Sequence, residues 1–225
     1  MRYSQLRIAF QPIWDIARDR VLGYEALMRP VDGTPPLVRI HQAKEQGSIL
    51  ELDRKARTLA MRDATHFLKD DEYLFVNVEP ESLQDINLWR PWPYTINPSQ
   101  VVLEVTERSM KEDLYPVCEY LRDVGVHLAI DDFGSGMSNL WMLDHFTPAF
   151  IKLDNVYLRH ESKHRILQAV VAGVRLLGAT LIVEGVERAE DVEYLHRIRV
   201  NYAQGFHLGK PSFVEEWVGH LRFEP

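Results

Sequence analysis

The sequence contains a single cysteine and no long uninterrupted apolar run. Cys118 cannot form an internal disulfide, which suits a reducing cytoplasm, and its place in "LYPVCEYLRDVG" predicts a small buried side chain on a helix. The N-terminal stretch "MRYSQLRIAFQPIW" lacks the apolar core of a signal peptide. The most apolar stretch, "ILQAVVAGVRLLGATLIV", is interrupted by Gln168, Arg175 and Gly178, so it predicts a packed helix followed by a buried strand. We therefore expect a soluble, cytoplasmic chain without a membrane segment.

The sequence also lacks an excess of positive charge. Its 26 lysines and arginines are outnumbered by 33 aspartates and glutamates, which gives a formal net charge of −7. Binding to long nucleic acids without sequence preference depends on neutralising many phosphates, so this acidic composition argues against that class of function. If the protein acts on a phosphate compound, metal ions must supply much of the positive charge.

Strand-like and helix-like segments alternate along the chain. Apolar runs bounded by turn residues predict eight strands, at residues 7–14, 22–29, 73–79, 101–107, 127–133, 150–154, 180–185 and 201–206. Amphipathic helical patterns lie between most of them, which predicts parallel βαβ units and one α/β domain over residues 1–225, a modified TIM (β/α)₈ barrel. The first connection, "DIARDR", is too short for a helical crossover, so the first strand should be antiparallel to the second.

One connection departs from the helical pattern. The segment "LWRPWPYTINPSQ", residues 88–100, contains three prolines and two tryptophans where a helix would be expected. Prolines at this density prevent a regular helix, so we expect an irregular segment that packs over the outside of the barrel. A partner-binding surface is the less favoured alternative.

Polar side chains stand at or just after the ends of the predicted strands. In a barrel of parallel strands these ends meet at one rim, where active sites lie. The residues that should gather there are Glu25, Asn77, Glu104, Glu107, Asp131, Asp132, Lys152, Asp154, Glu184, Glu187 and Gln204.

Carboxylates that converge in this way repel one another and need cations. Oxygen ligands favour magnesium, manganese or calcium over zinc or copper, and the adjacent Asp131 and Asp132 can serve a two-metal site. For either aspartate alone, a helix N-cap is the simpler interpretation. Lys152 can orient a nucleophilic water or stabilise developing negative charge, although a plain ion pair with Asp154 would also explain it.

A series of motifs now resembles one known family. "FQPIW", "GYEALMRP", "FVNVEPESL", "LEVTERSM", "AIDDFGSGMSNL", "IKLD", "IVEGVERAED" and "YAQGFHLGKP" occur in the order typical of EAL-domain cyclic di-GMP phosphodiesterases, from about residue 8 to residue 220. The resemblance implies a modified TIM barrel with an antiparallel first strand. It also implies metal-dependent hydrolysis of cyclic di-GMP to linear pGpG, a reaction that controls the level of a bacterial second messenger.

The resemblance assigns roles to individual residues. It implies that Glu25, Asn77, Glu104 and Asp131 bind one metal, and that Asp131, Asp132 and Glu184 bind a second. Lys152 would lie beside the attacking water, and Glu107 would anchor the loop after the paired aspartates. Glu187 is expected to take part in catalysis as well. The expected substrate contacts are Arg29, Gln204, Gln11 and Asp154.

The resemblance also predicts cofactors and partners. Two Mg²⁺ or Mn²⁺ ions are expected, with Ca²⁺ binding but not supporting catalysis. A homodimer and a sensor or cyclase partner domain are expected too. A catalytically silent module that binds cyclic di-GMP or a protein is the main alternative. A barrel enzyme that abstracts a proton from a sugar or carboxylate is a third hypothesis, which explains the carboxylates but not the ordered motifs.

Overall fold

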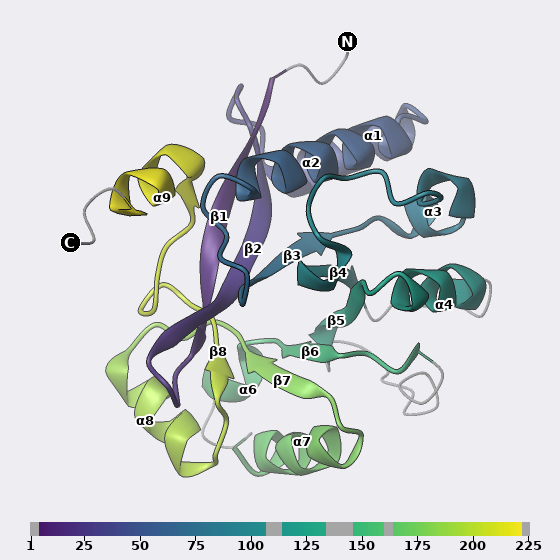
Figure 1. The fold of residues 1–225 in the computed structure, drawn as a ribbon. Coiled ribbons are helices and arrows are strands. Elements are labelled where there is room, and N and C mark those ends of the chain that lie inside the picture. The colour runs from purple at the N-terminus through teal and green to yellow at the C-terminus, as the bar shows by residue number, and fades with distance from the viewer. Residues whose placement is uncertain (1–4, 107–113, 134–145, 160–163, 222–225) are drawn as a thin grey trace.

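The computed structural model describes residues 5–106, 114–133, 146–159 and 164–221, whose strands form one closed barrel surrounded by helices (Figure 1). In chain order the elements are β1 (Leu6–Asp15), β2 (Arg20–Pro30), α1 (Pro36–Glu45), α2 (Ile49–Ala64), β3 (Tyr73–Asn77), α3 (Pro80–Leu83), the 3-10 turns η1 (Ile86–Leu88) and η2 (Pro98–Gln100), β4 (Val101–Thr106), α4 (Tyr115–Asp123), β5 (His127–Phe133), β6 (Phe150–Leu153), α6 (Val156–Arg159), α7 (His164–Leu176), β7 (Thr180–Val183), α8 (Ala189–Arg197), β8 (Tyr202–Ala203), β9 (Ser212–Phe213) and α9 (Val214–Leu221). Among the described helices, none combines the length and the apolar character needed to cross a lipid bilayer.

The strand order confirms the predicted modified TIM barrel. The sheet runs β2-β3-β4-β5-β6-β7-β8-β1, and β1 closes it by pairing with β2. The pairs from β2 to β8 are parallel, whereas β1 is antiparallel to both β2 and β8. The short connection after β1 enforces this reversal, because it leaves no room for a crossover helix.

Three features of the fold were not expected from the sequence. Helix α1 was not predicted, and neither was β9, a two-residue strand that pairs with β1. The eighth strand is confined to Tyr202–Ala203 instead of the predicted 201–206. Its pairing ends just before Gln204, whose backbone N–H donates to the carbonyl of Val183 and whose carbonyl accepts the N–H of Val186.

The barrel interior is filled by one apolar residue from each of six strands. These residues form a cluster separate from the larger core between strands and helices: Ile13, Phe75, Val102, Ala129, Phe150 and Ile182. Side chains two positions apart along a strand share a face, so the next inward position carries the polar layer. Two residues beyond these apolar positions on β3 to β7 lie Asn77, Glu104, Asp131, Lys152 and Glu184. On the reversed β1 the matching residue lies two positions earlier, at Gln11, which pairs in register with Glu25.

The segment 88–100 is the packed cover that the sequence predicted. Trp89 is fully buried and Trp92 packs against the main core, while the indole N–H of Trp92 donates to the carbonyl of Ile96 at 3.0 Å. Cys118 is likewise 1% exposed, and burial raises the pKa of its thiol to about 11. The expectation of a small buried side chain on a helix is therefore confirmed.

Gly23 offers a direct test of how tightly the strands approach. A Cβ at this position would lie 2.2 Å from the carbonyl oxygen of Tyr73 on the neighbouring strand. We expect Gly23→Ala to lower the free energy of unfolding by about 1–3 kcal/mol, because the strands must separate to admit the methyl group. Gly173→Ala on α7, where a Cβ would meet nothing within 4 Å, should raise it by about 0.5–1 kcal/mol. Urea unfolding of both variants measures the two free energies of unfolding. Equal changes in the two variants would contradict the close approach of the strands at Gly23.

Candidate active site

The polar layer converges on the ammonium group of Lys152. Lys152 lies on β6, is 1% exposed, and reaches four carboxylates, which come from β2, β4, β5 and the residue just after β7. Its Nζ lies 2.8 Å from both Glu104 Oε1 and Glu184 Oε1, 3.1 Å from Glu25 Oε2 and 3.5 Å from Asp131 Oδ1. Burial favours the neutral amine, but these carboxylates outweigh it and hold the pKa of Lys152 well above its ordinary value.

Amide side chains join the same network. Asn77 donates from Nδ2 to Glu25 Oε1 at 3.1 Å and to Glu104 Oε2 at 3.0 Å. Gln204 donates from Nε2 to Glu25 Oε2 at 2.7 Å. Burial works against ionisation of Glu25, yet Lys152 and the two amides together lower its pKa below the ordinary value. Glu25 is therefore held as a carboxylate.

Three carboxyl groups of the site, those of Glu184, Glu104 and Asp132, are less easily ionised. Burial raises the pKa of Glu184 to about 7, with Lys152 opposing the rise. Burial also raises the pKa of Glu104 well above its ordinary value, and the neighbouring Glu25 and Asp131 add to this. The pKa of Asp132 is raised by burial and by the charges of Asp131 and Asp154. One ammonium therefore does not balance the negative charge that these strands bring together.

A break in the regularity of β5 lets two adjacent aspartates reach the same site. Neighbouring residues of a regular strand point to opposite faces. The pairing of β5 with β6 shifts register between Ile130 and Phe133, and Asp132 has a φ of 55°, in the left-handed region that aspartate tolerates. Carboxylate oxygens of Asp131, Asp132 and Glu184 consequently lie within 4.8 Å of one another.

These oxygens fit a hard divalent cation. Asp131 Oδ1 and Gln204 Oε1 are buried and accept no hydrogen bond from the described residues. Carboxylate and amide oxygens are the ligands that Mg²⁺, Mn²⁺ and Ca²⁺ prefer. The donor set is therefore suited to a divalent ion.

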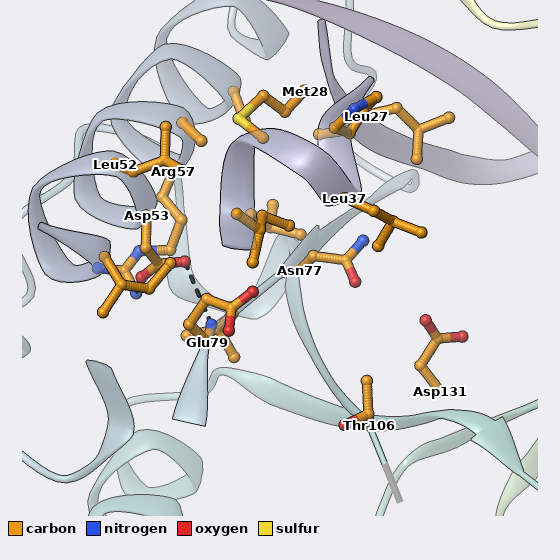
Figure 2. A pocket seen from close by; sticks show the side chains of 18 of the residues that line it. Leu27, Met28, Leu37, Leu52, Asp53, Arg57, Asn77, Glu79, Thr106 and Asp131 are labelled. Carbon is orange, nitrogen blue, oxygen red and sulfur yellow. Dashed lines mark hydrogen bonds and ion pairs between the residues drawn. The ribbon is translucent and has the colours of Figure 1, made fainter. Parts of the chain in front are cut away.

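A cavity of about 480 Å³ opens beside these groups. Figure 2 shows Asn77 and Asp131 on one side of it and the pair Asp53 and Arg57 on the other. Apolar side chains from α1 and α2, among them Leu37 and Leu52, line the rest. The arrangement puts a carboxylate-rich edge next to a recess that is lined largely by apolar side chains.

The structure brings most of the predicted site residues together, and it places the others individually. The six expected metal ligands meet around or next to Lys152, and Gln204 contacts Glu25 directly. Arg29 lines the cavity, where burial lowers its pKa, and it donates to the carbonyl of Met28. Gln11 donates from Nε2 to the carbonyl of Gly209 at 3.0 Å.

Two predicted residues, Asp154 and Glu187, differ from this pattern. Asp154 accepts the N–H of Val156 at 2.7 Å and so caps the turn that starts α6, although its charge still reaches Asp132. Glu187 is exposed, and its backbone N–H donates to Asp191. Glu107 lies outside the described residues. Sequence reasoning did not anticipate Glu79, Asp53 and Arg57 at the cavity, and the only signal for the latter two was their i, i+4 spacing on a helix.

The ion pairs of Lys152 lead to a prediction for the metal-free protein. In the presence of a chelator, we expect Lys152→Met to lower the free energy of unfolding by about 3–5 kcal/mol, because it leaves buried carboxylates without their cation. The loss should be larger at pH 8 than at pH 6. Burial raises the pKa of Glu184 to about 7, so this group is largely protonated at pH 6 and largely ionised at pH 8, and a neutral carboxyl needs no counter-charge.

Lys44→Met is the matched control. Lys44 pairs with Glu79 at 2.7 Å but is 41% exposed, so its removal should cost less than about 1 kcal/mol. Urea unfolding at both pH values gives the comparison. A Lys152→Met protein as stable as the Lys44→Met protein would contradict the charge balance described here.

The chain is similar to several known proteins. The chain is 31% identical over 240 residues to the probable cyclic di-GMP phosphodiesterase PdeN of Escherichia coli, covering 99% of this chain and 46% of PdeN. A solved structure of the PaMucR phosphodiesterase in complex with c-di-GMP superposes with a TM-score of 0.85 at 28% identity, covering 94% of each chain. The manganese and cyclic di-GMP complex of Klebsiella pneumoniae BlrP1 at pH 6 gives a TM-score of 0.82 at 30% identity, covering 95% of this chain and 57% of BlrP1.

A family model gives the broadest match. The model described as the EAL domain matches residues 1–211, which is most of the chain. The matched range contains every strand of the closed barrel and all the groups around Lys152. The chain belongs to the EAL domain family.

Proposed function

We propose that this protein is a metal-dependent phosphodiesterase that hydrolyses cyclic di-GMP to linear pGpG. The observation that carries the proposal is the meeting of the six expected ligands, Lys152 and an adjoining cavity at one rim of the barrel. Family membership and the cyclic di-GMP complexes of similar structures support the choice of substrate.

The proposed cofactors are two divalent ions, Mg²⁺ or Mn²⁺. Glu25, Asn77, Glu104 and Asp131 would hold one, and Asp131, Asp132 and Glu184 the other. When bound, such ions supply positive charge to the phosphate and lower the pKa of a coordinated water. The BlrP1 structures with manganese and with calcium support this ion class. Ca²⁺ is proposed to bind without supporting turnover.

The protein's own groups have distinct tasks in this proposal. Lys152 stays protonated among its carboxylates, so it can hold the attacking water by donating a hydrogen bond and can stabilise negative charge as it develops. Gln204 and Asn77 keep Glu25 ionised and oriented. Arg29, which lines the cavity, is proposed to contact a substrate phosphate, with Gln11 and Asp154 as further proposed substrate contacts. Glu107 and Glu187 are proposed to support the loop and the reaction.

Loss of Glu25 should test the chemistry. We expect Glu25→Ala to lower the rate of pGpG formation by more than about 100-fold, with either Mg²⁺ or Mn²⁺. A residue that only supports a metal ligand typically causes a smaller loss, so an effect of this size would indicate a direct ligand. Glu72→Gln is the matched control, because Glu72 is an equally buried carboxylate away from the rim. Chromatographic separation of cyclic di-GMP and pGpG gives the readout.

Each outcome of that assay has a clear meaning. Turnover by the unaltered chain and the Glu72→Gln protein, but not by Glu25→Ala, would support the proposal. Binding of cyclic di-GMP without turnover would instead identify a catalytically silent binding module. Neither binding nor turnover would contradict the substrate assignment.

Arg29 should affect substrate binding but not metal binding. Arg29 lines the cavity, and its charge reaches Glu25, but no hydrogen bond or ion pair to a carboxylate is found for it among the described residues. Arg29→Ala should therefore raise the KM for cyclic di-GMP about tenfold or more, because one charge-assisted contact to the substrate is lost. Mn²⁺ affinity measured without substrate should stay within about twofold. Steady-state kinetics and calorimetry check the two parts separately. A loss of Mn²⁺ affinity would contradict the substrate-only role.

We also propose that this domain works in the cytoplasm as a homodimer, together with a sensor or cyclase domain. Family membership supports this, and the chain spans about half or less of the length of the curated relatives it matches. Analytical ultracentrifugation of the purified chain tests the dimer. A monomer at micromolar concentrations, with and without cyclic di-GMP, would contradict it.

A further inference from the structure

The Pro- and Trp-rich segment 88–100 does more than cover the barrel. Trp89 is fully buried, and its indole Nε1–H donates to the carbonyl oxygen of Ser82 at 2.9 Å. The guanidinium carbon of Arg57 lies 4.4 Å from the centroid of the Trp89 ring, close enough for a cation–π contact. This tryptophan therefore packs against a buried charge and not only against apolar side chains.

The buried charge belongs to an ion pair on α2. Arg57 Nη1 lies 2.7 Å from Asp53 Oδ2, and the two side chains are 1% and 5% exposed. The hydroxyl of Ser82 donates to the same oxygen of Asp53. The other oxygen, Asp53 Oδ1, accepts the backbone N–H of Glu79 at 3.2 Å, the contact drawn as a dashed line in Figure 2.

That last contact lies two residues after Asn77. Asn77 is the final residue of β3, and its side chain is exposed apart from its bonds to Glu25 and Glu104. Beyond it, the N–H of Val78 bonds the carbonyl of Glu104 at 3.1 Å, and the next anchor is the bond from Glu79 to Asp53. Asp53 is thus one of the groups that hold the chain where it leaves β3, beside the Val78–Glu104 bond and the ion pair of Glu79 with Lys44.

We propose that Asp53 is a positioning residue for the metal site, held in place by Arg57, Ser82 and Trp89. It fixes the backbone after β3 and thereby orients the amide of Asn77 toward the carboxylates of Glu25 and Glu104. The inference rests on the proposed function, because it gives Asn77 a role as a metal ligand. It also gives the segment 88–100 a task, since Trp89 completes the enclosure of the Arg57–Asp53 pair.

A stability role alone does not account for this network well. Replacing a buried ion pair by apolar side chains of similar volume is often neutral or stabilising, so the pair is weak evidence for stability. Asp53 instead directs one oxygen at a backbone N–H beside the site. The same strand offers a matched comparison at its other end. Glu72, just before β3, is 5% exposed and accepts the backbone N–H of Lys69 at 3.0 Å.

The test is Mn²⁺ binding to metal-free protein, measured by calorimetry without substrate. The main variant combines Asp53→Ala with Arg57→Met, so that no unpaired charge stays buried. Ser82→Ala is a milder variant that leaves the ion pair in place, and Glu72→Ala is the control. Thermal melting establishes that each protein is folded, and if the double variant does not fold, Ser82→Ala decides.

We expect the double variant to bind Mn²⁺ about tenfold more weakly, which is the lower end of the range of losses typical of residues that orient a metal ligand. Ser82→Ala should weaken Mn²⁺ binding less. The Mn²⁺ concentration for half-maximal hydrolysis should rise by the same factor, with kcat at saturating Mn²⁺ nearly unchanged. Glu72→Ala should leave both quantities unchanged even where it lowers the melting temperature.

Two results would overturn the inference alone. The first applies if the unaltered chain binds Mn²⁺ and hydrolyses cyclic di-GMP. In that case, a folded double variant with the same Mn²⁺ affinity as the unaltered chain would contradict the role of Asp53. The other is an equal loss in the Glu72→Ala control, which would make the effect a general consequence of destabilisation. Failure of the unaltered chain to bind Mn²⁺ would overturn the proposed function and this inference with it.

Discussion

The site depends on one buried ammonium group among carboxylates that come from separate strands. Lys152 draws Glu25, Glu104, Asp131 and Glu184 to within 3.5 Å or less of a single nitrogen. Without that cation their mutual repulsion in a poorly solvated rim would push the strand ends apart or force the groups to bind protons. The same contacts keep Lys152 charged, so the shape of the rim and the protonation of its members depend on each other.

The barrel supplies the framework for this convergence through the two-residue period of its strands. One inward position carries an apolar side chain that fills the interior, as Phe75, Val102 and Phe150 do, and the next carries a polar group. The apolar layer fills the barrel interior on one side of the polar layer, so it excludes water there and fixes where the polar layer lies along the barrel. The antiparallel β1 obeys the same rule in reverse, which is why Gln11 precedes Ile13 whereas Lys152 follows Phe150.

Much of this was predictable, because strand ends and period-two spacing are local properties of the sequence. The antiparallel first strand followed from a short connection, and the meeting of Glu25, Glu104 and Lys152 followed from strand order. The irregularity at Asp131 and Asp132 was not predictable, since it depends on how β5 meets β6. The contact between Asp53 and Glu79 joins residues 26 positions apart through a bend after β3, and no local pattern encodes it.

Under the proposed function, the charge count at the rim also explains how an acidic protein could act on an anionic substrate. Five carboxylates lie at or beside Lys152, and Arg29 adds one positive charge at the cavity wall. Protonation of Glu184 and Glu104, whose pKa values burial raises, would relieve repulsion but would offer no attraction to a phosphate. Divalent cations relieve the repulsion and attract the phosphate at once. Under the proposed function, the acidity that argues against nucleic-acid binding would therefore let this rim recruit the divalent cations that bind a phosphate.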